Sequence, residues 1–208
     1  TLDVSRVDSV ELADGFSGAS TGLEVISGDA ESGTEIAAGE TAVNWDFSDV
    51  TLENISKISG SGEGDDITGS AGDDVMLGSG GDDSLDGGDG ADTVKGGGGD
   101  DVLDGGAGDD TVKGGGGNDT LLHDAEDGKV DGGDGDDTLS LDGSTDSALD
   151  ITTLAGTTLK NLEVIDLAGG GNSVTLDKTS LQDISSSTDT LRIDGGAGDS
   201  VIATADEW

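Results

Sequence analysis

Apolar residues return every nine positions between residues 60 and 140, and the residues between them are mostly glycine and aspartate. Cut from Gly60, this segment reads GSGEGDDIT, GSAGDDVML, GSGGDDSLD, GGDGADTVK, GGGGDDVLD, GGAGDDTVK, GGGGNDTLL, HDAEDGKVD and GGDGDDTLS. Position eight of the nonapeptide is always apolar, as Ile67, Met76, Leu85, Val94, Leu103, Val112, Leu121, Val130 and Leu139. A short fixed period of this kind is typical of a solenoid.

Each nonapeptide is predicted to form a turn followed by a short strand. Glycine in the first six positions allows backbone conformations with positive φ, which other residues adopt only at a cost. The last three residues, such as 93–95, suit a strand, in which successive side chains point to opposite faces. The apolar side chain at position eight is therefore expected to point inward.

A longer period of eighteen residues is superimposed on the first. Position eight is valine or methionine in one alternate set of repeats and leucine or isoleucine in the other. Position nine alternates too, so that Lys95 is expected to stack on Lys113 and Asp86 on Asp104. The pattern predicts an all-β fold, namely a parallel β-roll, or β-solenoid, with two short parallel sheets around a thin core and 18 residues per coil.

Position six carries aspartate in every repeat except HDAEDGKVD, where Gly128 replaces it. Because stacked strands lie about 4.8 Å apart, aspartates eighteen residues apart are expected to form two columns. Carboxylates this close need a neutralising partner. Ca²⁺ accepts roughly six to eight carboxylate and carbonyl oxygens in flexible geometry, whereas Mg²⁺ demands a tighter octahedron, so calcium is favoured.

We therefore predict multiple calcium ions, about six in all. About four are expected between the loops of Asp65, Asp83, Asp101, Asp119 and Asp137, and about two between those of Asp74, Asp92 and Asp110. Turn carbonyls are expected to complete the coordination, from Gly78, Gly80, Gly87, Gly90, Gly96, Gly98, Gly99, Gly105, Gly108, Gly114, Gly116 and Gly117.

The pattern GGxGxDxUx, with U apolar, is clearest in GGAGDDTVK and GGGGNDTLL and resembles the hemolysin-type calcium-binding repeat of the RTX family. This resemblance covers about 80 of the 208 residues. It implies a parallel β-roll with calcium between successive turns, and export from bacteria by type I secretion. Residues 161–177 and 191–202 show a second resemblance, to modules of large secreted bacterial surface proteins that include RTX adhesins.

The flanks are predicted to be broader, less regular solenoid coils that cap the roll. Both contain the pattern TLxNhxxh, with h apolar, at residues 51–58 and 158–165, and such runs are typical of strands. Caps would cover the core and strand edges at the solenoid ends. The expected domains are an N-terminal cap at 1–59, the calcium-binding roll at 60–143 and a C-terminal cap at 144–208, which is expected to be truncated at Trp208.

Charge and composition narrow the partners. Asp and Glu number 47 against 8 Lys and Arg, for a net charge of −39. Nucleic acid is excluded, because binding phosphates needs basic patches, and anionic membrane surfaces are disfavoured for the same reason. No apolar run is long enough for membrane insertion, and the absence of cysteine excludes disulfides and thiolate zinc sites. Self-repulsion is expected to keep the metal-free chain expanded, so that folding and calcium binding become one event.

Residues that could carry other chemistry are few. His123, the only histidine, has no nucleophile or second imidazole to work with and is expected to be a surface residue in a bulge. Asp124, Glu126 or Asp127 beside it could still bind an ion irregularly. Trp45 and Phe47 alternate as in a strand, and core packing is favoured over a carbohydrate platform.

Paired carboxylates, such as Asp109 and Asp110, could suggest glycosidase chemistry, but their repetition favours ion binding, with position five a solvated carboxylate. No catalytic residue is identified, and the chain is not expected to be an enzyme. The leading hypothesis is a calcium-binding module of a secreted or cell-surface bacterial protein, similar to RTX adhesins, that folds after export. Any surface, carbohydrate or protein target is expected to bind other parts of the parent protein.

Two alternatives remain open. One is a C-terminal accessory domain of a secreted RTX enzyme, such as a protease, a lipase or a polysaccharide-modifying enzyme. The other is a calcium-dependent component of a surface layer or filament.

Overall fold

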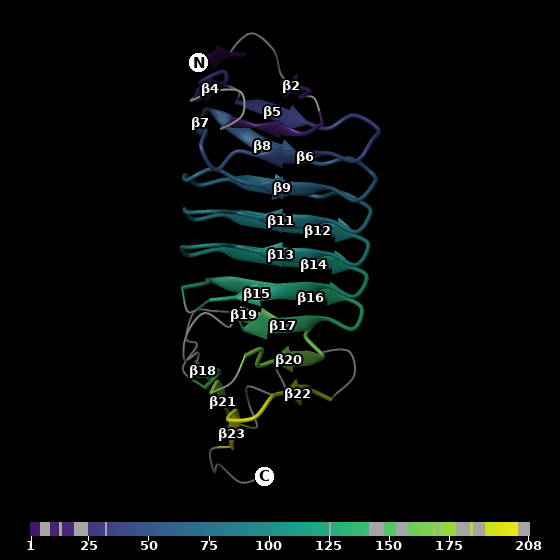
Figure 1. Ribbon diagram of the computed structural model, residues 1–208, viewed down its shortest axis with the longest axis vertical. Helices are drawn as coiled ribbons and strands as arrows, with labels where there is room; N and C mark the ends of the chain where they lie inside the picture. The colour runs from purple at the N-terminus through teal and green to yellow at the C-terminus, as the bar shows by residue number, and fades with distance from the viewer. Residues whose placement is uncertain are drawn as a thin grey trace.

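The computed structural model describes residues 1–4, 9–12, 14–18, 25–31, 33–124, 126–141, 148–152, 158–169, 171–177, 184 and 190–203. Short strands are stacked above one another along one long axis, and the turns that join them line both edges of the stack (Figure 1). Every strand pair in this described part is parallel. The predicted all-β parallel roll is confirmed.

Two long sheets form the body of the molecule. The eight-stranded sheet has the order β19 (Thr158–Lys160), β16 (Lys129–Asp134), β14 (Thr111–Gly116), β12 (Thr93–Gly98), β10 (Val75–Leu77), β8 (Ile55–Ser59), β5 (Thr34–Ala37) and β2 (Ser9–Val10). The nine-stranded sheet has the order β22 (Arg192–Asp194), β20 (Val164–Asp166), β17 (Thr138–Leu141), β15 (Thr120–His123), β13 (Val102–Asp104), β11 (Ser84–Asp86), β9 (Asp66–Thr68), β6 (Asn44–Asp46) and β3 (Phe16–Ser17).

Two three-stranded sheets lie in the flanks. One has the order β1 (Leu2–Asp3), β4 (Val25–Ser27) and β7 (Thr51–Glu53), and the other β18 (Ala148–Asp150), β21 (Ser173–Leu176) and β23 (Ser200–Ala203). Within the described residues, no helix has the length and apolar character needed to cross a membrane.

The strand register follows the eighteen-residue period. Leu85 pairs with Leu103 in one long sheet, and Val94 pairs with Val112 in the other. At position nine, Lys95 pairs with Lys113 and Asp86 with Asp104, as predicted. Two nonapeptides therefore complete one coil, and each contributes a strand to a different sheet.

The core is a single column of apolar side chains between the two sheets. All nine residues at position eight are at most 2% exposed. Burying an apolar side chain of this size contributes roughly 1.5–3 kcal/mol, so the column is the main source of stability that does not depend on a ligand. The inward orientation predicted for position eight is confirmed.

Glycine is required in the turns where consecutive coils approach one another. Gly97 and Gly99, at positions two and four, have φ of 128° and 134°. A Cβ atom on either residue would also collide with the carbonyl oxygen of the residue eighteen positions earlier, Ser79 or Gly81. Side chains are therefore excluded by both the backbone conformation and the spacing of the coils.

The flanks continue the long sheets, as predicted for caps. The two TLxNhxxh runs do not form single strands, because Asn54 and Asn161 take left-handed conformations, with φ of 56° and 50°, and bend the chain. Short polar asparagine tolerates this conformation better than most residues. The domain boundaries at residues 59 and 143 stay predictions.

Aromatic residues fill the N-terminal part of the core. Trp45 and Phe47 are buried, with ring centroids 6.2 Å apart in an edge-on arrangement. Phe16 lies 5.3 Å from Phe47, between centroids. The core role predicted for Trp45 and Phe47 is confirmed.

Candidate metal centre

The position-six aspartates form two hydrogen-bonded columns. In the first, column A, the backbone N–H of each aspartate donates to Oδ1 of the aspartate one coil later, at 2.8 to 2.9 Å, through Asp65, Asp83, Asp101, Asp119 and Asp137. In the second, column B, the same bond of 2.7 Å joins Asp74 to Asp92 and Asp92 to Asp110. The predicted columns exist, and in each of these pairs Oδ1 of the later aspartate joins its coil to the preceding one.

The second carboxylate oxygen has no protein partner in most of these aspartates. Oδ2 is buried and accepts no hydrogen bond in Asp83, Asp92, Asp101, Asp110, Asp119 and Asp137. A buried polar atom without a partner is costly, and a charged one more so. Six such atoms in two regular columns indicate ligands for a cation.

Each of these oxygens lies in the space left by the position-one glycine of its own turn. A Cβ atom on Gly78 would collide with both Oδ2 of Asp83 and the carbonyl oxygen of Gly96 from the next coil. A Cβ atom on Gly114 would collide in the same way with Oδ2 of Asp119 and the carbonyl oxygen of Gly132. Carboxylate and carbonyl oxygens converging from adjacent coils are the hard ligands that Ca²⁺ prefers, so the residues fit this ion.

The electrostatics of the columns agree with this reading. Burial, with a smaller effect of neighbouring carboxylates, raises the pKa of Asp83 and Asp92 to about 7. Burial likewise raises the pKa of Asp101, Asp110 and Asp137 to about 6. The backbone N–H groups lower these pKa values without offsetting burial. The fold by itself therefore disfavours the charged carboxylates that it stacks.

A scan against protein families matched residues 59–94, 86–121 and 129–148 to the RTX calcium-binding nonapeptide repeat (4 copies). These residues match the RTX repeat, and the match spans less than half of the chain. Such repeats bind calcium in a structural, non-catalytic roll, and proteins that carry them are typically secreted by the type I route. Comparison with curated proteins and with solved structures found no match.

The candidate sites contain few acidic side chains. In the described part of the chain, no three His, Cys, Asp or Glu side chains gather as a metal cluster. Each regular turn supplies one buried carboxylate, so most ligands of a bound ion would be backbone carbonyls. Position-five carboxylates such as Asp100 are exposed, as predicted, and Oδ1 of Asp100 accepts the N–H of Asn118 one coil later at 2.7 Å.

The predicted carbonyl ligands fall into distinct groups. Those facing an Oδ2 atom across adjacent coils belong to Gly78, Gly87, Gly96 and Gly105. Those accepting an N–H from the preceding coil belong to Gly98 and Gly116. Those lying where a Cβ atom would be on the glycine eighteen residues later belong to Gly90, Gly99 and Gly117. The remaining predicted ligands are Gly80, Gly108 and Gly114, and the ligand role of all twelve glycines stays a prediction.

The first aspartate of each column has protein partners on Oδ2. The N–H of Ser61 donates to Oδ2 of Asp65 at 2.6 Å, and its hydroxyl to Oδ1 at 3.1 Å. The N–H and hydroxyl of Ser70 donate to Oδ2 of Asp74 at 2.7 and 2.8 Å. A cation would compete with these bonds at Asp65 and Asp74. The metal role of all eight column aspartates stays a prediction.

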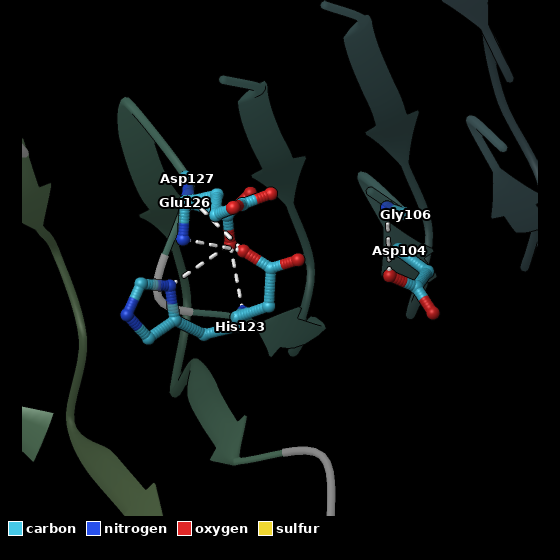
Figure 2. Close-up of polar contacts among 6 residues, drawn as sticks. Asp104, Gly106, His123, Glu126 and Asp127 are labelled. Carbon is cyan, nitrogen blue, oxygen red and sulfur yellow. Dashed lines mark hydrogen bonds and ion pairs between the residues drawn. The ribbon is translucent and has the colours of Figure 1, made fainter. Parts of the chain in front are cut away.

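The broken repeat differs from expectation at His123. This residue is buried, only 5% exposed, and its Nδ1 lies 2.9 Å from Oδ2 of Asp127 (Figure 2). The prediction of a surface residue was wrong, because position one is buried in the regular repeats too, as at Gly105 and Gly114, and His123 takes the same inward place at the end of β15. Asp127, also buried, accepts the N–H of Asp124 as well, at 3.1 Å.

Gly128 stands where the next aspartate of column B would be, so the aspartates of this column stop at Asp110, as the sequence suggested. Its N–H and that of Lys129 both donate to the carbonyl oxygen of Asp110, each at 2.9 Å. The charges of Asp127 and Asp124 add to burial in raising the pKa of Asp110. Column B therefore ends beside the buried carboxylate of Asp127, which stands at position five of the broken repeat.

Glu163 is a buried acid that the sequence reasoning missed. Its Oε2 accepts the N–H of Asp137 at 2.9 Å, so it continues column A beyond the last RTX repeat. One signal was present in the sequence, since Glu163 precedes the apolar Ile165 by two residues, as Asp137 precedes Leu139.

Proposed function

We propose that this chain is a non-catalytic folding module of a secreted or cell-surface bacterial protein, ordered by calcium in its two aspartate columns. The observation that carries the proposal is the set of six buried Oδ2 atoms without a protein partner, each beside a turn glycine. Without a cation, these oxygens would be buried without a hydrogen-bond partner, and burying a charged carboxylate in this way is energetically costly.

The chain's own residues prepare the sites. Oδ1 of each column aspartate fixes the spacing of the coils, and the position-one glycines leave room beside Oδ2. Bound calcium supplies positive charge and joins oxygens of adjacent coils. The position-eight core packs once the coils are in register, so ordering and ion binding are coupled.

The predicted number of about six ions is kept in this proposal, with the first site of each column the weakest because of Ser61 and Ser70. Extracellular calcium modules bind at about 10⁻⁴ to 10⁻³ M. Affinity in that range leaves the chain unfolded before export and folded afterwards. The domains at 1–59 and 144–208 act as caps, since their strands extend the sheets of the roll.

The assignment to an adhesin-like parent rests on the resemblance of residues 161–177 and 191–202 to modules of such proteins. In this proposal the module is a rigid spacer, and other parts of the parent protein bind the surface, carbohydrate or protein target.

The test compares the chain in chelator, in millimolar calcium and in millimolar magnesium by circular dichroism and thermal melting. We expect β-structure and a cooperative melt in calcium, and an expanded chain in chelator and in magnesium. The same β signal and melting temperature in chelator and in calcium would sink the proposal.

A further inference from the structure

Column A does not stop at the last nonapeptide. Thr138 in β17 pairs with Val164 in β20, so the residue before Val164, Glu163, takes the place that Asp137 holds one coil earlier. The backbone bonds repeat as well, since the N–H of Val164 donates to the carbonyl of Asp137 at 3.0 Å, as that of Thr138 donates to Asp119 at 2.8 Å. Glu163 is the sixth carboxylate of the column.

The carbonyl of Asn161 replaces a turn carbonyl of the repeat. It lies beside Gly132 together with Oδ2 of Asp137, just as the carbonyl of Gly132 lies beside Gly114 together with Oδ2 of Asp119. The left-handed conformation of Asn161 bends the chain at this point, and its Nδ2 donates to Oδ1 of Asp131 at 2.7 Å. A single residue of the flank therefore reproduces the carbonyl placement of a glycine turn.

The carboxylate that faces this space is fully buried. Asp137 is 0% exposed, and its Oδ2 accepts no hydrogen bond. Glu163 is 7% exposed. Two buried acids, hydrogen-bonded through the N–H of Asp137, and a carbonyl therefore lie where a column site would follow by repetition.

We propose that Asp137, the carbonyl of Asn161 and Glu163 form an additional calcium site at the junction between the roll and the C-terminal flank, outside the nonapeptide pattern. The inference rests on the proposed calcium binding of the roll and adds a site to it. The ion joins β17 to β20, so that ordering of the flank depends on calcium although the flank carries no nonapeptide at this place.

The test compares Glu163→Gln with wild type in the full 208-residue chain. Glutamine keeps an oxygen that can accept the N–H of Asp137 but removes the charge. We expect one calcium ion fewer by native mass spectrometry, and amide hydrogen exchange in β20 about tenfold faster in calcium. Glu53→Gln, an exposed glutamate in β7, is the matched control and should change neither readout.

The outcomes separate the two proposals. A wild-type chain that binds no calcium overturns the proposed function itself. A wild-type chain that binds calcium, with an equal number of ions in Glu163→Gln, overturns only the junction site. If the variant does not fold, anomalous diffraction from wild-type crystals grown in calcium decides the matter. A peak between Asp137 and the carbonyl of Asn161 supports the site, and no peak there overturns it.

Discussion

The backbone N–H of Asp101 donates a 2.9 Å hydrogen bond to Oδ1 of Asp119, one coil further along the roll, while Oδ2 of both side chains is buried without a partner. The two oxygens of each carboxylate therefore have different roles. Oδ1 satisfies the backbone of the preceding coil, and Oδ2 is left for a cation. Substitutions that keep the first role and remove the second can separate folding from ion binding.

Asp101→Asn is expected to weaken the calcium-bound roll only. Asparagine can still accept the N–H of Asp83, which now donates to Oδ1 of Asp101 at 2.8 Å, but it brings no charge to the ion. Urea unfolding in saturating calcium should show a loss of about 1–3 kcal/mol, the usual size for a bond to a charged group. In calcium-free buffer the β signal and melting temperature should not fall.

Asp100→Asn is the matched control for that substitution. Asp100 precedes Asp101 directly and is exposed. Its side chain also accepts a backbone N–H, that of Asn118 in the next coil. Its unfolding free energy in saturating calcium should stay within about 0.5 kcal/mol of wild type, and its β signal in calcium-free buffer should equal that of wild type. Equal losses for Asp101→Asn with and without calcium would contradict the division of roles between its two oxygens.

Acid should partly replace calcium. Burial raises the pKa of Asp83 and Asp92 to about 7, and of Asp101, Asp110 and Asp137 to about 6, from 3.8. The folded, metal-free roll thus binds more protons than the unfolded chain. Its stability is greatest below about pH 4 and is lost as the pH rises through about 6 to 7.

Melts followed by circular dichroism from pH 8 to pH 5 check this sign. In calcium-free buffer the β signal and melting temperature should increase on acidification. In saturating calcium they should decrease, because protons compete with the ion for the same oxygens. A calcium-free chain that loses β-structure over this range would show that the column carboxylates do not control its stability.

Serine at position two should have opposite effects in two turns. Ser79 has φ of 92°, a strained value for a residue with a side chain, whereas Ser61 lies outside that region and binds Asp65. Ser79→Gly should stabilise the calcium-bound roll by about 1 kcal/mol. Ser61→Gly should destabilise it by a similar amount, because the hydroxyl bond to Asp65 is lost. Urea unfolding of both variants is the measurement, and changes of the same sign would refute the assignment.

The roll itself could be predicted because its period fixes the neighbours of every residue. Leu85 and Leu103 occupy position eight, and their side chains are expected to point inward. Once this is known, the pairing of the strands and the two aspartate columns follow from the eighteen-residue spacing alone. The same spacing cannot reveal the hydroxyl bonds of Ser61, since Ser79 occupies the same position and is strained instead.

The eighteen-residue period cannot predict which residues are neighbours where the repeat is interrupted. Asp137 and Glu163 are stacked although 26 residues separate them, so counting by eighteen does not bring them together. The burial of His123 does follow the repeat, since position one is buried at Gly114 and Gly132 as well, and the prediction overlooked it. Its contact with Asp127 does not follow from the repeat, because the regular turns have glycine at position one.

The buried pair of His123 and Asp127 should be energetically coupled. Their side chains are 3% and 2% exposed and 2.9 Å apart, so removing either partner leaves a buried polar group behind. His123→Ala and Asp127→Ala should each cost about 3 kcal/mol of unfolding free energy in calcium. The double variant should cost about 2 kcal/mol less than the sum, since neither group is then left behind. Glu126→Ala, at an exposed neighbour, should change little, and additive single losses would show that the pair does not stabilise the broken repeat.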